Sequence, residues 1–238
     1  MAREEAEYEQ DDAITVPSEF AQRSFIEMGV APAKLHKIPY GVRLDRFQRV
    51  GEPPKDRFDV LFVGQVGLRK GVPWLLQAFY QLKHPQKRLR IVGMMQPEFR
   101  SILPRLPQEN VEFLGHLPQD RLAAVMSSSH VMVLPSIEEG LALVQAQAMA
   151  CGCPLISSTN TGAEDLFTDG IEGFVVPIRS PEAIAGRLQQ LADDPALQRR
   201  MSEAALLRIR QIGGWHQYGD GWIKTLWHLS PGHTPAAE

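Results

Sequence analysis

The chain has 238 residues, of which 44% are hydrophobic and 22% charged, and its formal net charge is −3. This is the composition of an ordinary globular protein, and it excludes a disordered, collagen-like or disulfide-scaffold chain. The first twelve residues hold six acids and one Arg, so the rest of the chain is close to neutral and carries no basic excess for nucleic acid.

Short apolar or β-branched segments recur along the chain and predict eight strands. Several of them are apolar throughout, as is typical of parallel strands that are buried on both faces of a sheet. The predicted strands are Ala13–Val16, Leu35–Ile38, Asp59–Val63, Arg88–Val92, Val111–Leu114, His130–Leu134, Pro154–Ser157 and Gly173–Val176. Because helical patterns alternate with these strands, we expect an open parallel α/β sheet with right-handed crossovers.

Helical periodicity is clearest between the third and fourth predicted strands. Val72, Leu75, Leu76 and Phe79 have the i, i+3, i+4, i+7 spacing of one apolar helix face, which predicts a helix over Val72–Leu82. Two later helices are predicted to begin behind a polar capping residue and a proline at the first helical position. These pairs are Ser180–Pro181 and Asp194–Pro195.

Two stretches fall outside this alternation. Residues 50–57 read as a linker, and the strands and the helix over about Ser18–Met28 that precede it are too few to close a sheet. A final helix over Trp215–Leu229 carries an aromatic stripe, which is expected either to pack on the core of the domain or to form an interface. The tail from Ser230 to Glu238 is expected to fray.

The two cysteines, Cys151 and Cys153, are too close to close a loop, and no His cluster stands beside them to complete a metal site. No apolar run reaches the ~18 residues of a membrane span, and the amino terminus is not a signal peptide. We therefore expect a reduced cytoplasmic protein that has no metal and no integral membrane segment.

The first candidate ligand site is the glycine-rich segment Val63–Gly71, between a predicted strand and the helix that follows. Glycines let a ligand approach the backbone, and a helix N-terminus offers unpaired N–H groups to an anion. Arg69 and Lys70 add positive charge, so the segment suits a diphosphate. Its glycine spacing is neither a dinucleotide fingerprint nor a P-loop. A plain glycine-rich turn with solvated charges stays open as the alternative.

The second candidate site follows the strand that ends at Leu134. A turn with two acids and a glycine leads into a helix expected to start near Leu141. Glu139 could accept hydrogen bonds from sugar hydroxyls, and Gln147 lies further along the same helix. In the alternative, Glu138 and Glu139 complement the helix dipole in its first turn, and Gln147 is merely solvated.

Four sequence blocks carry a resemblance that covers about Asp12 to Trp227. They read ITVPSEF…KIPYGV…RF, FVGQVGLRKGVPWLLQAF, VEFLGHLP and VLPSIEEGLALVQAQAMACGCPLI. In order and spacing they resemble the donor-binding C-terminal half of a retaining GT-B glycosyltransferase of family 4, the glycosyl transferases group 1. The resemblance implies a Rossmann-like open parallel sheet flanked by helices.

The resemblance also implies roles for individual residues. Lys70 and Glu139 are the implied catalytic residues, the first at the diphosphate and the second at the transferred sugar. The implied donor and diphosphate contacts are Gly64, Gln65, Arg69, Lys70, Gly140, Leu141, Ala142 and Leu143; the ribose contact is Gln147; the base pocket is Phe113, Leu114, Gly115 and His116. Gln147 departs from the family's usual Glu, Gln65 from a frequent Arg, and Leu141-Ala142 from Phe-Gly.

The family pattern divides the chain into three parts. Residues 1–50 correspond to the end of an N-terminal acceptor domain and its linker, residues 51–212 to the nucleotide-sugar domain, and residues 213–238 to a helix that returns toward the N-terminal domain. The implied function is transfer of a sugar from a nucleotide diphosphate-sugar to a hydroxyl of a sugar, lipid-linked sugar or polysaccharide, without a cofactor and at most peripheral to a membrane. Alternatives are a split or truncated module that binds without turnover, and a sugar-nucleotide epimerase.

Overall fold

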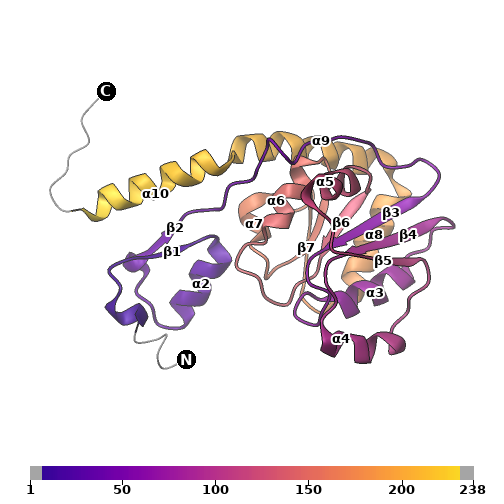
Figure 1. The fold of residues 1–238 in the computed structure, drawn as a ribbon, viewed down its shortest axis with the longest axis horizontal. Helices are drawn as coiled ribbons and strands as arrows, with labels where there is room; N and C mark the ends of the chain where they lie inside the picture. Colours follow the sequence, from indigo (N-terminus) through magenta and orange to yellow (C-terminus); the bar gives the residue numbers. More distant parts are fainter. Residues whose placement is uncertain (1–6, 231–238) are drawn as a thin grey trace.

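A six-stranded parallel sheet forms the centre of the protein, whose computed structural model describes residues 7–230 (Figure 1). The strands are β3 (Phe58–Val63), β4 (Lys87–Val92), β5 (Val111–Gly115), β6 (Val131–Leu134), β7 (Leu155–Ser158) and β8 (Gly173–Val176). Their order is β5-β4-β3-β6-β7-β8, so the winding direction reverses between β3 and β6. The predicted fold class is confirmed, and each predicted strand matches to within one residue at either end.

Helices cover both faces of this sheet. They are α3 (Val72–Gln81), α4 (Pro97–Ile102), α5 (Gln119–Ser127), α6 (Leu143–Ala150), α7 (Ala163–Leu166), α8 (Pro181–Asp193) and α9 (Pro195–Ile212). One buried cluster joins the sheet to α3 and α8 and includes Phe62 and Phe79. A second cluster joins it to α5, α6, α7 and α9 and includes Leu61 and Met132. Both faces of the strands are therefore apolar, which is why they lack alternation in the sequence.

The helix starts follow the predictions with two differences. Asp194 caps α9, since its carboxylate accepts from the backbone N–H of Ala196 and Leu197. Ser180 stands at the predicted position before α8, but its side chain makes no capping hydrogen bond, so that part of the prediction is wrong. Helix α6 starts two residues later than expected, because Ala142 still has an extended backbone (φ −80°, ψ 111°).

A small N-terminal unit precedes the sheet domain. It holds the parallel strands β1 (Ile14–Val16) and β2 (Leu35–Lys37), the helix α2 (Glu19–Glu27) and the single turn η1 (Pro32–Lys34). Asp165 of α7 joins the unit to the sheet domain: its carboxylate accepts from the backbone N–H of Glu19 at 2.8 Å and from Lys37 Nζ at 2.8 Å. This contact with Asp165 raises the pKa of Lys37.

No helix or strand lies in the segment between β2 and β3, which includes the predicted linker at residues 50–57. This segment is nevertheless anchored, because Val42 and Phe47 are buried in the sheet domain and the N–H of Val50 donates to Ser127 Oγ at 3.1 Å. Val42 also forms a backbone bridge with Gly214, where the chain leaves α9. The domain boundary at residue 50 stays a prediction.

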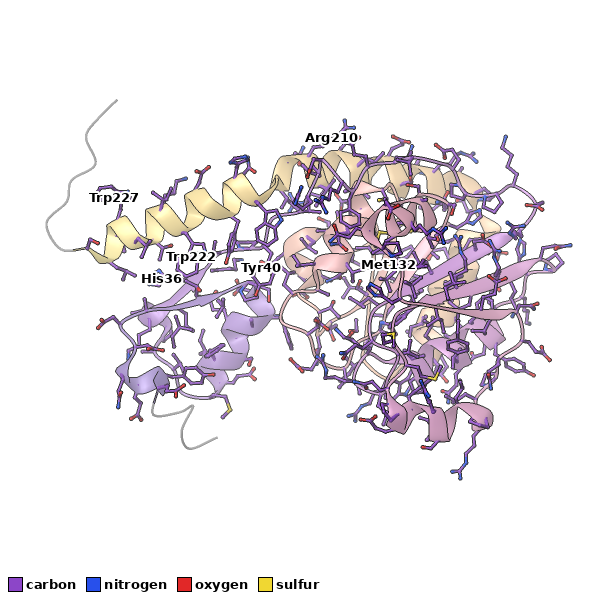
Figure 2. All side chains as sticks on the ribbon, viewed as in Figure 1. His36, Tyr40, Met132, Arg210, Trp222 and Trp227 are labelled. Carbon is purple, nitrogen blue, oxygen red and sulfur yellow. The ribbon has the colours of Figure 1, made fainter. Side chains whose placement is uncertain are left out.

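The last helix, α10 (Trp215–Leu229), has no buried side chain. It continues from α9 out of the sheet domain and passes over the N-terminal unit (Figure 1). Tyr218 packs against Tyr40 with ring centroids 5.9 Å apart, and Trp222 lies on the side that faces β2, whereas Trp227 lies on the other side (Figure 2). Packing on the domain core, one of the two expectations, is therefore wrong. The expected fraying after Ser230 concerns residues outside the described range.

Both cysteines are buried and free. Burial raises the pKa of the Cys151 thiol to about 12 and raises that of Cys153 as well. Among residues 7–230 no cluster of three or more His, Cys, Asp or Glu side chains could hold a metal ion. No helix in that range is both long and apolar enough to cross a membrane.

Helix α10 is expected to exchange its amide hydrogens much faster than α9. The two helices are neighbours of similar length, but α9 buries five side chains and α10 none, and weakly packed segments open locally at low cost. Hydrogen exchange followed by mass spectrometry checks this, with α9 as the internal control. Equal protection of the two helices would show that α10 is held as firmly as the domain core.

Candidate functional site

Two loops meet at the carboxyl edge of the sheet, where its winding reverses. The β3–α3 loop spans residues 64–71 and the β6–α6 loop spans residues 135–142. The loops are adjacent because β3 pairs directly with β6, and the N–H of Ile137 donates to the carbonyl of Arg69 at 2.8 Å. In open α/β sheets this reversal point is where ligands bind.

Lys70 and Glu139 form an ion pair between the two loops. Lys70 Nζ donates to Glu139 Oε2, and the two side chains are only 13% and 19% exposed. Arg69 adds a second cation, since its Nη1 donates to the Glu138 carbonyl at 3.1 Å and lies 3.8 Å from the Glu139 carboxylate. Neither glutamate lies in the first turn of α6, so the helix-dipole alternative is wrong. The site thus holds two cations against two carboxylates.

Gly71 makes this close approach of the loops possible. Its φ is +74°, and a Cβ atom at this position would overlap the carbonyl oxygen of Pro135. Glycine is the residue that adopts this backbone conformation at little cost and leaves room for a neighbouring backbone. The glycine between Lys70 and α3 therefore sets the distance between the two loops.

The start of α6 offers free hydrogen-bond donors. Within the described part of the chain, no backbone N–H from Gly140 to Val144 has a hydrogen-bond acceptor. Free N–H groups at a helix start, with Lys70 and Arg69 close by, form an anion-binding arrangement. Leu141 and Ala142 are buried in the turn itself, whereas Leu143 is 38% exposed.

Next to this arrangement stands a row of glycines: Gly64 follows β3, Gly93 follows β4, and Gly115 ends β5. Gly93 donates its N–H to the Gly115 carbonyl at 2.8 Å, and a Cβ on Gly93 would overlap the Gly64 carbonyl. All three glycines are half-buried, and nothing lies within 4 Å of the place where a Cβ on Gly115 would stand. The remaining predicted base-pocket residues lie beside this row with exposed side chains, namely Phe113, Leu114 and His116.

The two predicted glutamines of the site, Gln65 and Gln147, have different surroundings. Gln65 accepts a hydrogen bond from Gln96 at 3.3 Å, a residue after β4 that the sequence reading did not single out. Gln147 is half-buried on α6. The fully buried amide of this helix is Gln145, which donates to the Thr161 carbonyl at 2.8 Å and ties α6 to the β7–α7 loop.

Three polar residues that sequence reasoning missed hold the β6–α6 loop. Ser158 and Asn160 donate to the carbonyls of Ser136 and Ile137, and Ser18 of the N-terminal unit donates to that of Gly140. The polar run after the predicted strand Pro154–Ser157 was a usable signal for the first two, because loops at neighbouring strand ends meet. Nothing in the sequence around Ser18 indicates its contact.

Comparison with known sequences identifies relatives. The sequence profile of the family Glycosyl transferases group 1 matches residues 45–208. A D-inositol 3-phosphate glycosyltransferase from Streptomyces avermitilis is 32% identical over 206 residues, which are 76% of this chain and 44% of that protein. An alpha-D-kanosaminyltransferase from Streptomyces kanamyceticus is 31% identical over 156 residues, 63% of this chain and 40% of that protein. The chain spans about half the length of the curated relatives it matches.

Solved structures share the fold. A sucrose-phosphate synthase from Thermosynechococcus elongatus superposes with a TM-score of 0.84 at 29% identity, over 95% of this chain and 61% of that one. HepE from Anabaena, solved in complex with UDP-glucose, superposes with a TM-score of 0.79 at 20% identity, over 90% of this chain and 63% of that one. The sheet and its helices are therefore those of a GT-B type domain.

Gly71→Ala is expected to lower the free energy of unfolding by about 2–4 kcal/mol, because the methyl group meets a backbone carbonyl at a positive φ. The matched control is Gly186→Ala, since Gly186 lies exposed within α8 with open space around it. That change is expected to raise the free energy by about 0.5–1 kcal/mol. Urea unfolding measures both values. An unchanged stability of Gly71→Ala would mean that the loop at Pro135 moves away freely.

Proposed function

The chain belongs to the family Glycosyl transferases group 1, and from this premise we propose that it binds a nucleotide diphosphate-sugar and serves its transfer, with retention, to an acceptor hydroxyl. The observation that carries the proposal is the meeting of Lys70, Arg69 and the free N–H groups at the start of α6 with Glu139, where the winding of the sheet reverses. The HepE structure in complex with UDP-glucose supports the choice of ligand class.

In this proposal the groups of the site act on two different parts of the donor, the diphosphate and the sugar. Lys70, Arg69 and the N–H groups from Gly140 to Leu143 stabilise the negative charge that grows on the departing diphosphate, an electrostatic effect that lowers the barrier of the transfer step. Glu139 accepts hydrogen bonds from hydroxyls of the sugar. These donors supply the neutralising charge, so the proposal includes no metal ion.

The row of glycines takes the nucleoside. In this proposal the base would rest on this row, beside Phe113 and His116, and Gln147 would bond the ribose. We further propose that the protein is a family 4 member of the cytoplasm, and that the acceptor, a sugar, lipid-linked sugar or polysaccharide, binds a separate N-terminal domain. The greater length of the curated relatives supports this last point.

Two variants of the ion pair separate the roles of its partners. Lys70→Ala is expected to weaken binding of both UDP and UDP-glucose by about 1–3 kcal/mol, because both ligands lose a charge-assisted contact. Glu139→Gln is expected to weaken UDP-glucose more than UDP, because only the former carries the sugar. Isothermal titration calorimetry measures each affinity, with GDP and GDP-glucose as the second ligand pair.

The matched control for the cation is Lys83→Ala. Lys83 is exposed and follows the opposite end of α3, so this variant loses a lysine far from the loops and should bind like the wild type. Unchanged affinity of Lys70→Ala would overturn the diphosphate assignment. Equal weakening of both ligands by Glu139→Gln would assign Glu139 to the support of Lys70 and not to the sugar.

Turnover is tested by incubating the protein with UDP-glucose and a panel of sugar acceptors. Release of free UDP together with a glucosylated acceptor supports the transfer reaction. Binding without release in every case favours a module that holds its ligand without turnover. A sugar that changes while still attached to UDP would identify an epimerase and contradict the proposal.

A further inference from the structure

Four side chains from three segments of the chain hold the turn that carries Glu139. Four of the five carbonyl oxygens from Ser136 to Gly140 accept a side-chain hydrogen bond. The donors are Ser158 to Ser136, Asn160 to Ile137 at 3.0 Å, Arg69 to Glu138 at 3.1 Å, and Ser18 to Gly140. Because the peptide group is planar, each held carbonyl also fixes the direction of the next N–H. These four hydrogen bonds therefore fix the orientation of most peptide groups in the turn.

Ile137 is the residue of this turn that is held on both sides. Its N–H donates to the carbonyl of Arg69 in the loop after β3, and its carbonyl accepts from Asn160 in the loop after β7. The strands β3 and β7 flank β6 in the sheet. The chain thus leaves Ile137 in a direction set by both neighbouring loops, and Glu139 follows two residues later.

Among the four donors, Asn160 is the one for which we find no structural role besides its hydrogen bond to this turn. Ser18 also caps α2, Arg69 belongs to the charged site, and Ser158 is fully buried within β7. Asn160 lies half-buried in its loop, and its Oδ1 accepts from the Thr159 hydroxyl at 3.1 Å. That bond turns the amide so that Nδ2 faces the Ile137 carbonyl.

We propose that Asn160 is a positioning residue of the donor site, which sets the turn that presents Glu139 to the sugar. This inference rests on the proposed function of the site. Loss of the amide leaves the Ile137 carbonyl without its donor, so the part of the turn that leads into Glu139 is held less firmly, although Arg69 still donates to the Glu138 carbonyl. Gly140 keeps its own bond to Ser18, so the N–H groups that follow stay in place for the diphosphate.

The test is Asn160→Asp, which keeps the shape of the side chain and replaces the N–H donor by an oxygen that repels the Ile137 carbonyl. The dissociation constant for UDP-glucose is expected to rise about tenfold, the usual effect of losing one hydrogen bond in a covered site. That for UDP is expected to stay within about twofold of the wild type. A merely structural role would weaken both ligands alike and lower the Tm.

The matched control is Asn110→Asp, the same change at the amino end of β5, on the far edge of the sheet. Asn110 is exposed with φ 58°, a conformation that Asp also tolerates, so binding should not change. Should Asn160→Asp fail to fold, Thr159→Val removes the exposed hydroxyl that orients the amide, and a smaller loss selective for UDP-glucose is expected.

The possible outcomes distinguish failure of the proposed function from failure of the positioning role of Asn160. If the wild type binds neither UDP nor UDP-glucose, and neither GDP nor GDP-glucose, the proposed function fails and the role of Asn160 fails with it. If the wild type binds and Asn160→Asp binds both ligands of a pair unchanged, or weakens both equally, the positioning role is overturned while the proposed function stands. A selective loss of the sugar nucleotide in Asn160→Asp or Thr159→Val supports the positioning role.

Discussion

The approach of two backbone loops at the centre of the sheet is the constraint on which the rest of the site depends. Strands β3 and β6 are neighbours, but their loops could not close on each other if Gly71 carried a side chain. Once the loops touch, Lys70 and Glu139 pair across them, and the start of α6 comes beside two cations. The pairing of Lys70 with Glu139 thus depends on the absence of a side chain at Gly71.

The ion pair also prepares the site for its proposed ligand. A lysine that is 13% exposed would carry an unfavourable charge without a partner, and Glu139 balances it while no ligand is bound. A diphosphate can take over the role of counterion, which releases the carboxylate toward the sugar. Lys70 and Glu139 would then balance each other's charge while the site is empty. With a donor bound, Lys70 would contact the diphosphate and Glu139 the sugar.

Much of the architecture could be predicted, because buried parallel strands are apolar throughout and Val72–Leu82 has a clear helical period. The placement of the two cations and of Glu139 at the carboxyl edge of the sheet could be predicted as well, because the loops that carry them each follow a predicted strand. The contacts of Ser18 and Asn160 could not, because single polar residues in loops show no period and their partners are distant in sequence. The position of α10 was open for a related reason: an aromatic stripe indicates that a surface is covered but not which one.

The bridge between Val42 and Gly214 has a mechanical consequence. The chain enters the sheet domain through one of these residues and leaves it through the other, and the two crossings touch. Two connections that touch at one point limit the relative motions that leave the bridge intact: a rotation about this point would keep it, whereas a translation of the N-terminal unit along the domain would break it. Such a rotation would separate the contacts that Ser18 and Asp165 make between the N-terminal unit and the sheet domain, and the Ser18 contact is one of the four bonds that orient the turn at Glu139.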